Sequence, residues 1–139
     1  MIEIATINEA DIKRIHNGLV YDLSLQIPYL SGTRAFTNYG LTENGKGHAF
    51  GMECIKQIID VVDVESWNNL IGKQVRIDYE INATIEGIGN IQKDVWFYPE
   101  HIKYFVIEKF SQRSFNWLTC KNKERILLGL TPLPLRNPI

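Results

Sequence analysis

A regular alternation of apolar and polar side chains between Leu19 and Tyr29 restricts the possible folds of this chain more than any other feature. The apolar side chains occupy every second position, at Tyr21, Leu23, Leu25, Ile27 and Tyr29. Successive side chains of a β-strand point to opposite faces, so the pattern predicts a strand with one buried and one solvated face. Pro28 cannot donate a hydrogen bond to a neighbouring strand, so we expect that end at a sheet edge or a strand exit.

Further β-rich segments surround this strand. Residues 2–7 predict a first strand, whereas residues 8–15 are compatible with either a helical turn or a second strand. The dipeptide Asn17-Gly18 predicts a two-residue turn, because both residues tolerate positive φ. Residues 34–41 predict a returning strand after the turn at residues 31–33.

The period changes from about residue 48 to residue 63, where the pattern becomes helical. The apolar side chains that share one face of this helix are Phe50, Cys54, Ile58 and Val61 or Val62. Ser66 is then expected to cap a short helical turn that ends at Gly72. Two strands are predicted after it, one starting near Val75 and one in residues 85–91.

The C-terminal part is predicted to be helical and then extended. Pro99 suits the first position of a helix that we expect to end near Phe110. A last helix is expected from about Phe115 to Leu128, ending at Gly129. The remaining residues include three prolines, which indicates an extended arm. Because the arm is rather apolar, we expect it to lie on its own domain or on a second subunit.

This order of elements indicates the fold class. Hairpins of strands, one helix, two more strands and closing helices fit an antiparallel α+β domain better than repeating βαβ units. We therefore predict a sheet of about five to six strands with one central helix and C-terminal helices. A length of 139 residues fits a single domain. Residues 1–99 would form its core, and residues 100–139 the C-terminal helices and the proline-rich arm.

Composition argues against several classes of function. The net charge of -1 argues against binding of a nucleic acid polymer, which depends on clustered Lys and Arg. Two separated cysteines indicate a reduced, intracellular protein, and the sequence predicts no zinc site, signal peptide or membrane span. No catalytic motif and no cofactor fingerprint is found. We therefore expect no catalytic residue, no metal and no cofactor.

The segment from Glu86 to Tyr98 contains the strongest candidates for a binding site. Gly87 and Gly89 interrupt a predicted strand, which indicates either a bulge or tight strand crossing or a close approach by another backbone or a ligand. Asn90 carries both a donor and an acceptor that could bind a base edge or a ribose. The three consecutive aromatics Trp96, Phe97 and Tyr98 could be core residues with a hydrophobic staple before the helix at Pro99, or a platform on which a purine stacks.

Basic side chains could hold the phosphates of the same ligand. Arg34 and Phe36 lie two residues apart, so they share a face of the predicted strand, with Tyr39 nearby. A guanidinium next to an aromatic ring can bind a phosphate and a base together. Arg76 and Lys93 are the other candidates for phosphate contacts.

The order of several motifs resembles that of a family of small bacteriophage proteins. These motifs are RAFTNYGL at residues 34–41, the helix at 51–62, VESWNNLIGKQVRI at 64–77 and IEGIGNIQKDVWFYP at 85–99. The resemblance covers roughly residues 5–99, and the positions that match are Phe36, Tyr39, Trp67, Gly72, Arg76, Gly89, Trp96 and Phe97. The chain also departs from the family pattern: Arg34 replaces a glutamine, and Ala35, Thr37 and Asn38 replace glycines.

The chain is similar in this respect to the phage Thoeris anti-defence sponges, and the resemblance implies a function. Such proteins sequester cyclic ADP-ribose isomers made by bacterial TIR-domain enzymes, without turnover, and some also hold cyclic oligonucleotides at separate sites. The implied partner is thus a small nucleotide-like signalling molecule. The implied assembly is a dimer or hexamer in the host cytoplasm. The site residues that we predict are Arg34, Phe36, Tyr39, Arg76, Asn90, Lys93, Trp96 and Phe97.

Two other classes of function stay open. A phage inhibitor that acts by direct protein–protein contact, such as an anti-CRISPR protein or a replication accessory factor, would use exposed aromatics and the apolar tail. An enzyme acting on nucleotides is the least favoured class, because acid–base candidates are few.

Overall fold

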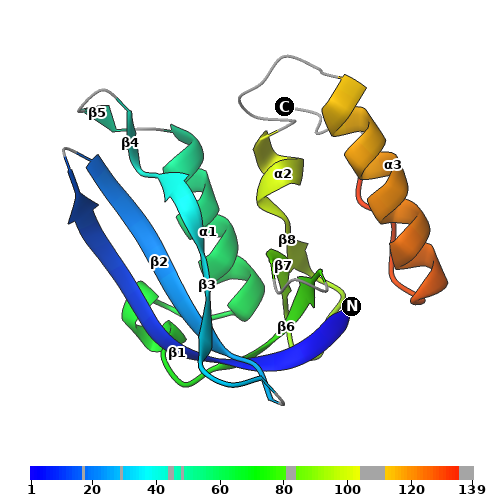
Figure 1. Ribbon diagram of the computed structural model, residues 1–139, viewed down its shortest axis with the longest axis horizontal. Coiled ribbons are helices and arrows are strands. Elements are labelled where there is room, and N and C mark those ends of the chain that lie inside the picture. Colours follow the sequence, from blue (N-terminus) through cyan, green and yellow to red (C-terminus); the bar gives the residue numbers. More distant parts are fainter. Residues whose placement is uncertain are drawn as a thin grey trace.

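The computed structural model describes residues 1–16, 18–28, 30–43, 46–47, 49–80, 84–103 and 112–134, and side chains at 37–40, 42–43 and 49 lie outside that description. The predicted α+β class is confirmed (Figure 1). The strands are β1 (Ile2–Ile15), β2 (Gly18–Gln26), β3 (Thr33–Gly40), β4 (Thr42–Glu43), β5 (Lys46–Gly47), β6 (Gln74–Tyr79), β7 (Ile85–Gly89) and β8 (Trp96–Phe97). The helices are α1 (Ala49–Val62), the 3-10 turn η1 (Trp67–Leu70), α2 (Pro99–Ile102) and α3 (Gln112–Leu127).

The main sheet is antiparallel and curves around α1. Its six strands follow the order β3-β2-β1-β6-β7-β8, so β1 joins the N-terminal hairpins to the strands that follow α1. The curvature is strong enough for the two edges to approach each other. The ring of Phe36 on β3 meets the ring of Phe97 on β8 edge to face, with centroids 6.1 Å apart.

The main hydrophobic core fills the space between α1 and the concave face of this sheet. The helix contributes the face that its period predicts, namely Phe50, Cys54, Ile58 and Val61, all buried. The sheet contributes alternate residues, among them Tyr21, Leu23, Leu25 and Ile27 of the alternating segment. Burial of such side chains stabilises a fold by about 1.5–3 kcal/mol each. This core therefore accounts for the packing of α1 against the sheet.

The first strand is longer than predicted, and the turn after it lies one residue earlier. β1 runs to Ile15 because a bulge between Ile7 and Glu9 shifts the register, so that Ala10 as well as Ile7 points inward. Such a bulge breaks the alternation of side chains without ending the strand. Ile15 pairs with Gly18, so His16 (φ 54°) lies in the turn, Gly18 begins β2, and Asn17 is outside the described residues.

The structure also corrects several other predicted boundaries. The strand expected in residues 85–91 ends at Gly89 because the chain turns at Asn90, and a separate strand β8 follows. Pro99 begins α2 as expected, but the predicted continuation to Phe110 falls largely on residues 104–111, outside the description. The last helix is confirmed as α3, and Gly129 follows it with φ 76°.

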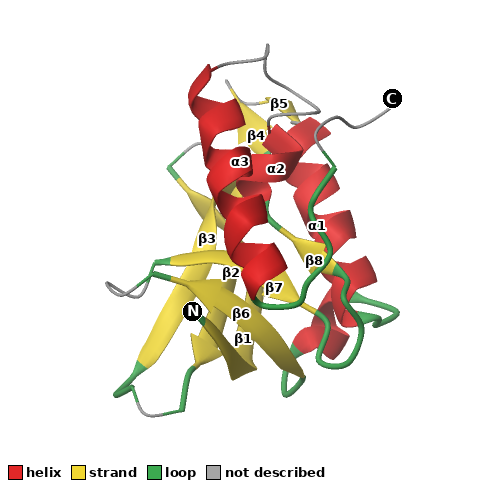
Figure 2. Cartoon of the chain, turned by 90° about the vertical axis from the view of Figure 1, so that its right-hand side faces the viewer, coloured by secondary structure: helices red, strands yellow, loops and turns green. Residues whose placement is uncertain are grey.

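A second layer lies on the convex side of the sheet. α3 packs against the outer face of β6 and β7, opposite α1 (Figure 2). Tyr98 and Leu118 are buried in this layer and are not part of the main core. The strands β6, β7 and β8 are therefore covered on both faces.

Candidate functional site

The outer face of β6, β7 and β8 is where half of the eight predicted binding residues meet. In the register of these strands, Arg76 pairs with Gly89, and Gly89 pairs with Trp96. A second row begins with the pair of Asp78 and Gly87, and Tyr98 reaches it from the end of β8. The pleat thus places two rows of side chains on the same face of the sheet.

The two glycines of β7 let aromatic rings lie directly on the strand. A Cβ atom on Gly89 would be 2.5 Å from two ring carbons of Trp96, and one on Gly87 would be 2.6 Å from the ring of Tyr98. The two rings stack on each other with centroids 5.8 Å apart and planes at 20°. The interpretation of these glycines as a bulge or tight strand crossing is thus confirmed: the register shifts between the pairs Asp78–Gly87 and Tyr79–Ile85, and the groups that approach are side chains of the neighbouring strand segment.

Charged side chains of α3 close over these rings. Lys121 and Arg125 are only 3% and 2% exposed. The Lys121 ammonium donates to Asp78 Oδ2 at 3.1 Å, to Glu124 Oε2 at 3.0 Å and to Glu86 Oε2. Buried charges are tolerated where they are paired and hydrogen-bonded, as they are here. This network joins α3 to β6 and β7.

Arg125 extends the network to Tyr98 and to the β7–β8 loop. Its Nη1 donates to the Tyr98 hydroxyl at 3.2 Å, and its Nη2 donates to Asp94 Oδ1 at 3.1 Å. The Tyr98 hydroxyl in turn donates to Asp78 Oδ2 at 2.8 Å. The guanidinium also lies 5.6 Å from the ring centroids of both Trp96 and Tyr98, within the range of a cation–π contact.

The surroundings of Tyr98 and Lys121 shift the pKa values of both groups, so that each keeps the proton with which it donates a hydrogen bond. Burial raises the pKa of Tyr98, and the nearby carboxylate of Asp78 raises it further, so the hydroxyl stays protonated and can donate. For Lys121, burial lowers the pKa, but hydrogen bonds to Glu86 and Glu124 and the charge of Asp78 outweigh it, and the net pKa is raised. At neutral pH the cluster therefore holds a charged ammonium and a neutral phenol.

Arg76, Asn90, Lys93 and Trp96 converge here, but the side chains of two of them, Arg76 and Asn90, mainly hold the β7–β8 loop in place. Arg76 Nε donates to the carbonyl of Asn90 at 2.8 Å, and Arg76 Nη2 donates to the carbonyl of Lys93 at 2.7 Å. The Asn90 amide donates to the carbonyl of Val61 at 2.8 Å, and its Oδ1 accepts from the backbone of Gln92 and Lys93 at 2.9 Å each. The guanidinium of Arg76 lies 5.0 Å from the ring centroid of Trp96. Of these four, Lys93 is the one with an exposed side chain.

Three other predicted residues, Arg34, Phe36 and Phe97, do not join this cluster. Phe36 and Phe97 are 3% and 1% exposed and belong to the inner core, so the prediction that they present faces to a ligand disagrees with their burial. Arg34 lies on β3, and its Nη1 donates to the carbonyls of Ser31 at 3.4 Å and Thr33 at 3.3 Å. The side chain of Tyr39 is outside the description. The eight residues therefore do not form one site.

The sequence patterns did not predict that the side chains of Asp78, Tyr98, Lys121 and Arg125 would form a buried hydrogen-bonded network. The spacing of Lys121 and Arg125 places them on one face of a helix, which normally indicates a solvated face. Only Gly87 and Gly89 signalled that something approaches this face closely.

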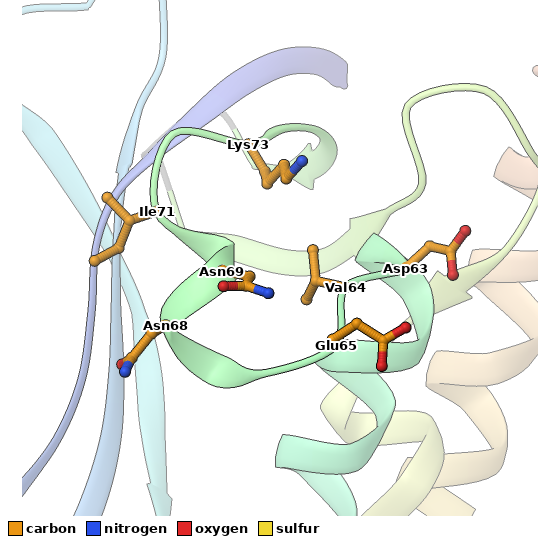
Figure 3. A pocket seen from close by; sticks show the side chains of 7 residues that line it. All are labelled: Asp63, Val64, Glu65, Asn68, Asn69, Ile71 and Lys73. Carbon is orange, nitrogen blue, oxygen red and sulfur yellow. The ribbon is translucent and has the colours of Figure 1, made fainter.

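A shallow hollow of about 500 Å³ lies elsewhere, between the end of α1 and β6 (Figure 3). It is lined by Asp63, Val64, Glu65, Asn68, Asn69, Ile71 and Lys73. None of the seven predicted residues whose side chains are described lines it. Across the described part of the chain, no three His, Cys, Asp or Glu side chains are grouped as a metal ion would require.

Exposed apolar side chains gather at the C-terminal end of α3. Ile126, Leu127 and Leu128 are 58%, 87% and 55% exposed, and we call these three residues the α3 tip. They directly follow Arg125, the last buried residue of α3.

Comparisons of the chain with protein-family models, with curated proteins and with solved structures found no match. None of the helices described has the length and apolar character needed to cross a lipid bilayer.

Proposed function

We propose that this protein is a non-catalytic binding protein that inhibits its target by direct contact with another protein. The observation that carries the proposal is the α3 tip, where three consecutive large apolar side chains are exposed. Contiguous exposed apolar surface is typical of protein interaction sites. The phage inhibitor that stays open as an alternative to the sponge would also act through exposed apolar surface, although we expected that surface in the aromatics and the tail.

Several of the predicted ligand-binding residues already make contacts within the chain. This supports an inhibitor that binds a protein over one that binds a nucleotide in a pocket. A pocket needs polar groups that point at the ligand, and the side-chain amide of Asn90 and two nitrogens of Arg76 already bind the chain itself. Two of the aromatics, Phe36 and Phe97, are covered by the inner core. The α3 tip, by contrast, presents its side chains to solvent.

The proposal is tested by comparing the proteins that are captured by the tagged native protein and by two tagged variants. Leu127→Glu places a carboxylate in the tip, and Lys123→Glu places the same carboxylate on an exposed position of the same helix. We expect a partner that is recovered with the native protein and with Lys123→Glu but not with Leu127→Glu. The purified partner should then bind Leu127→Glu at least ten times more weakly.

Two outcomes would contradict the proposal. One is a set of captured proteins that is the same for all three forms. The other is recovery of further copies of this chain alone, which would make the tip a surface of the predicted homo-oligomer.

Sequestration of a cyclic nucleotide-type signal is the second candidate function. It is favoured by the partly buried indole of Trp96, which has the guanidinium of Arg76 5.0 Å from its centroid and the exposed Lys93 on the adjoining loop. After incubation with cyclic ADP-ribose isomers and heat denaturation, a sponge releases the ligand with unchanged mass, and Lys93→Ala should retain less of it. No retained ligand and an unchanged melting temperature would refute this function.

A further inference from the structure

The segment at residues 131–134 is held against the domain by its backbone. It follows the turn at Gly129 and runs back along α3 (Figure 2). The Thr131 N–H donates to Asp94 Oδ2 at 2.7 Å, and the Thr131 carbonyl accepts from Arg125 Nε at 2.8 Å. We expected this arm to lie on its own domain or on a second subunit. Up to residue 134, it lies on its own domain.

The next contacts repeat this arrangement two residues further on. The Leu133 N–H donates to Asn122 Oδ1 at 2.7 Å, and the Leu133 carbonyl accepts from Asn122 Nδ2 at 3.0 Å. The Pro134 carbonyl accepts from His101 Nε2 at 3.0 Å. A side-chain amide that pairs with both groups of one residue imitates a neighbouring β-strand.

The prolines of the segment fit this pattern. In an extended chain, alternate residues direct their backbone groups to the same side. Thr131 and Leu133 are the residues whose N–H and carbonyl groups are both bound, whereas Pro132 and Pro134 have no N–H to offer. Proline at these two positions therefore loses no hydrogen bond and restricts the unbound chain, which lowers the entropic cost of binding.

The groups that hold the segment belong to fixed parts of the domain. Arg125 is buried and bound to Tyr98, and Asp94 is oriented by Arg125. Asn122 lies on α3 and His101 on α2. By contrast, the side chains of Thr131, Pro132 and Pro134 are exposed. The surface therefore binds the backbone of the segment and leaves most of its side chains in solvent.

We propose that Asp94, His101, Asn122 and Arg125 form a groove that binds an extended peptide with proline at alternate positions, and that residues 131–134 are its intramolecular ligand. Affinity would come from main-chain hydrogen bonds, as in the addition of a strand to a sheet edge. This groove uses other side chains than the α3 tip, so the inference goes beyond the proposed function and does not depend on it.

The attached segment competes with any peptide from outside. A tethered ligand has an effective concentration in the millimolar range when its linker is short. The native protein should therefore bind added peptide poorly, and release of the segment should open the groove.

The experiment uses the full chain and a labelled peptide of residues 129–134, Gly-Leu-Thr-Pro-Leu-Pro. The double variant Thr131→Pro/Leu133→Pro removes both N–H donors of the attached segment and leaves the groove unchanged. Pro132→Ala is the matched control, because Pro132 provides no hydrogen bond that holds the segment. Fluorescence polarisation measures binding, and circular dichroism checks that each variant is folded.

We expect the double variant to bind the peptide at least ten times more tightly than the native protein or Pro132→Ala. Adding Asn122→Ala to the double variant should abolish that gain, and a peptide that carries Leu133→Pro should not compete. The proposal is overturned if the native protein and the double variant bind equally, or if no binding is seen at 2 mM peptide, a concentration on the order of the effective molarity of a tethered ligand. Peptide binding that survives Asn122→Ala would also overturn it.

Discussion

Replacement of Gly89 by alanine should destabilise the protein far more than one methyl group normally does. The added Cβ would lie 2.5, 2.5 and 2.7 Å from three carbons of the Trp96 ring. Carbon atoms in contact are normally about 3.5–4.0 Å apart, so the indole would have to retreat by about 1 Å. It is restrained by the stacked ring of Tyr98 at 5.8 Å and by the guanidinium of Arg76 at 5.0 Å.

The expected cost follows from this restraint. Overpacking of a filled core costs about 1–3 kcal/mol, and we expect Gly89→Ala in the upper half of that range because the ring has little space into which it can move. Urea denaturation followed by far-UV circular dichroism measures the change in the free energy of unfolding. Gly47→Ala is the matched control, since a Cβ there meets no atom within 4 Å, and it should cost less than about 0.5 kcal/mol.

A double-mutant cycle tests the reasoning itself. If the clash with the indole is the cause, Gly89→Ala should be nearly neutral once Trp96→Ala has removed the ring. The coupling energy should then be about 2 kcal/mol. The same cost of Gly89→Ala in both backgrounds would refute the argument, because the loss would then come from the backbone of β7 and not from the ring.

Three further predictions concern the charged layer and the thiols. Lys121→Met should cost about 3 kcal/mol in urea denaturation, because it removes the buried cation of Asp78 and leaves only the N-terminal ammonium, 3.6 Å from Oδ1, and adding Asp78→Asn should recover part of that loss. The raised pKa values of Tyr98 and Lys121 mean that the folded state holds these protons more tightly than the unfolded state. The contribution of these two groups to the free energy of unfolding should therefore be constant at pH values below their pKa values in the unfolded chain, 10.0 for Tyr98 and 10.5 for Lys121. As the pH rises above these values, each group should lower the free energy of unfolding by up to about 1.4 kcal/mol per pH unit. Denaturation between pH 8 and 11 measures this decrease. Burial raises the pKa of Cys54 to about 12, so a thiol reagent should modify the exposed Cys120 at once and Cys54 only after unfolding; rapid reaction of both thiols would contradict this burial.

The local elements of this fold could be predicted because they depend on short-range patterns. Alternation between Leu19 and Tyr29 identified β2, and the helical period identified the buried face of α1. Gly129 marked the end of α3, where a positive φ favours glycine. The extent of β1 was missed because its bulge shifts the alternation within a continuous strand.

The candidate site was predictable only in part, for a physical reason. The alternation in β6 assigned Arg76 and Asp78 to a polar face, but a polar face can meet water or another charged layer equally well. Gly87 and Gly89 indicated a close approach without naming the group that approaches. Phe36 was predicted as a ligand contact because it shares a strand face with Arg34, and Phe97 because it lies in a run of aromatics, whereas their burial depends on the curvature of the sheet.

The sequence by itself determined most of the longer strands and helices and which of their residues are apolar, because propensity and periodicity act over a few residues. The tertiary structure alone decided that α3 covers the outer face of β6 and β7, and that Lys121 and Arg125 are buried there as ions. It also decided that Asn122 and Arg125 hold the backbone of residues 131–134. These contacts join residues that are distant in sequence, and their stability comes from geometry and desolvation, which no local pattern encodes.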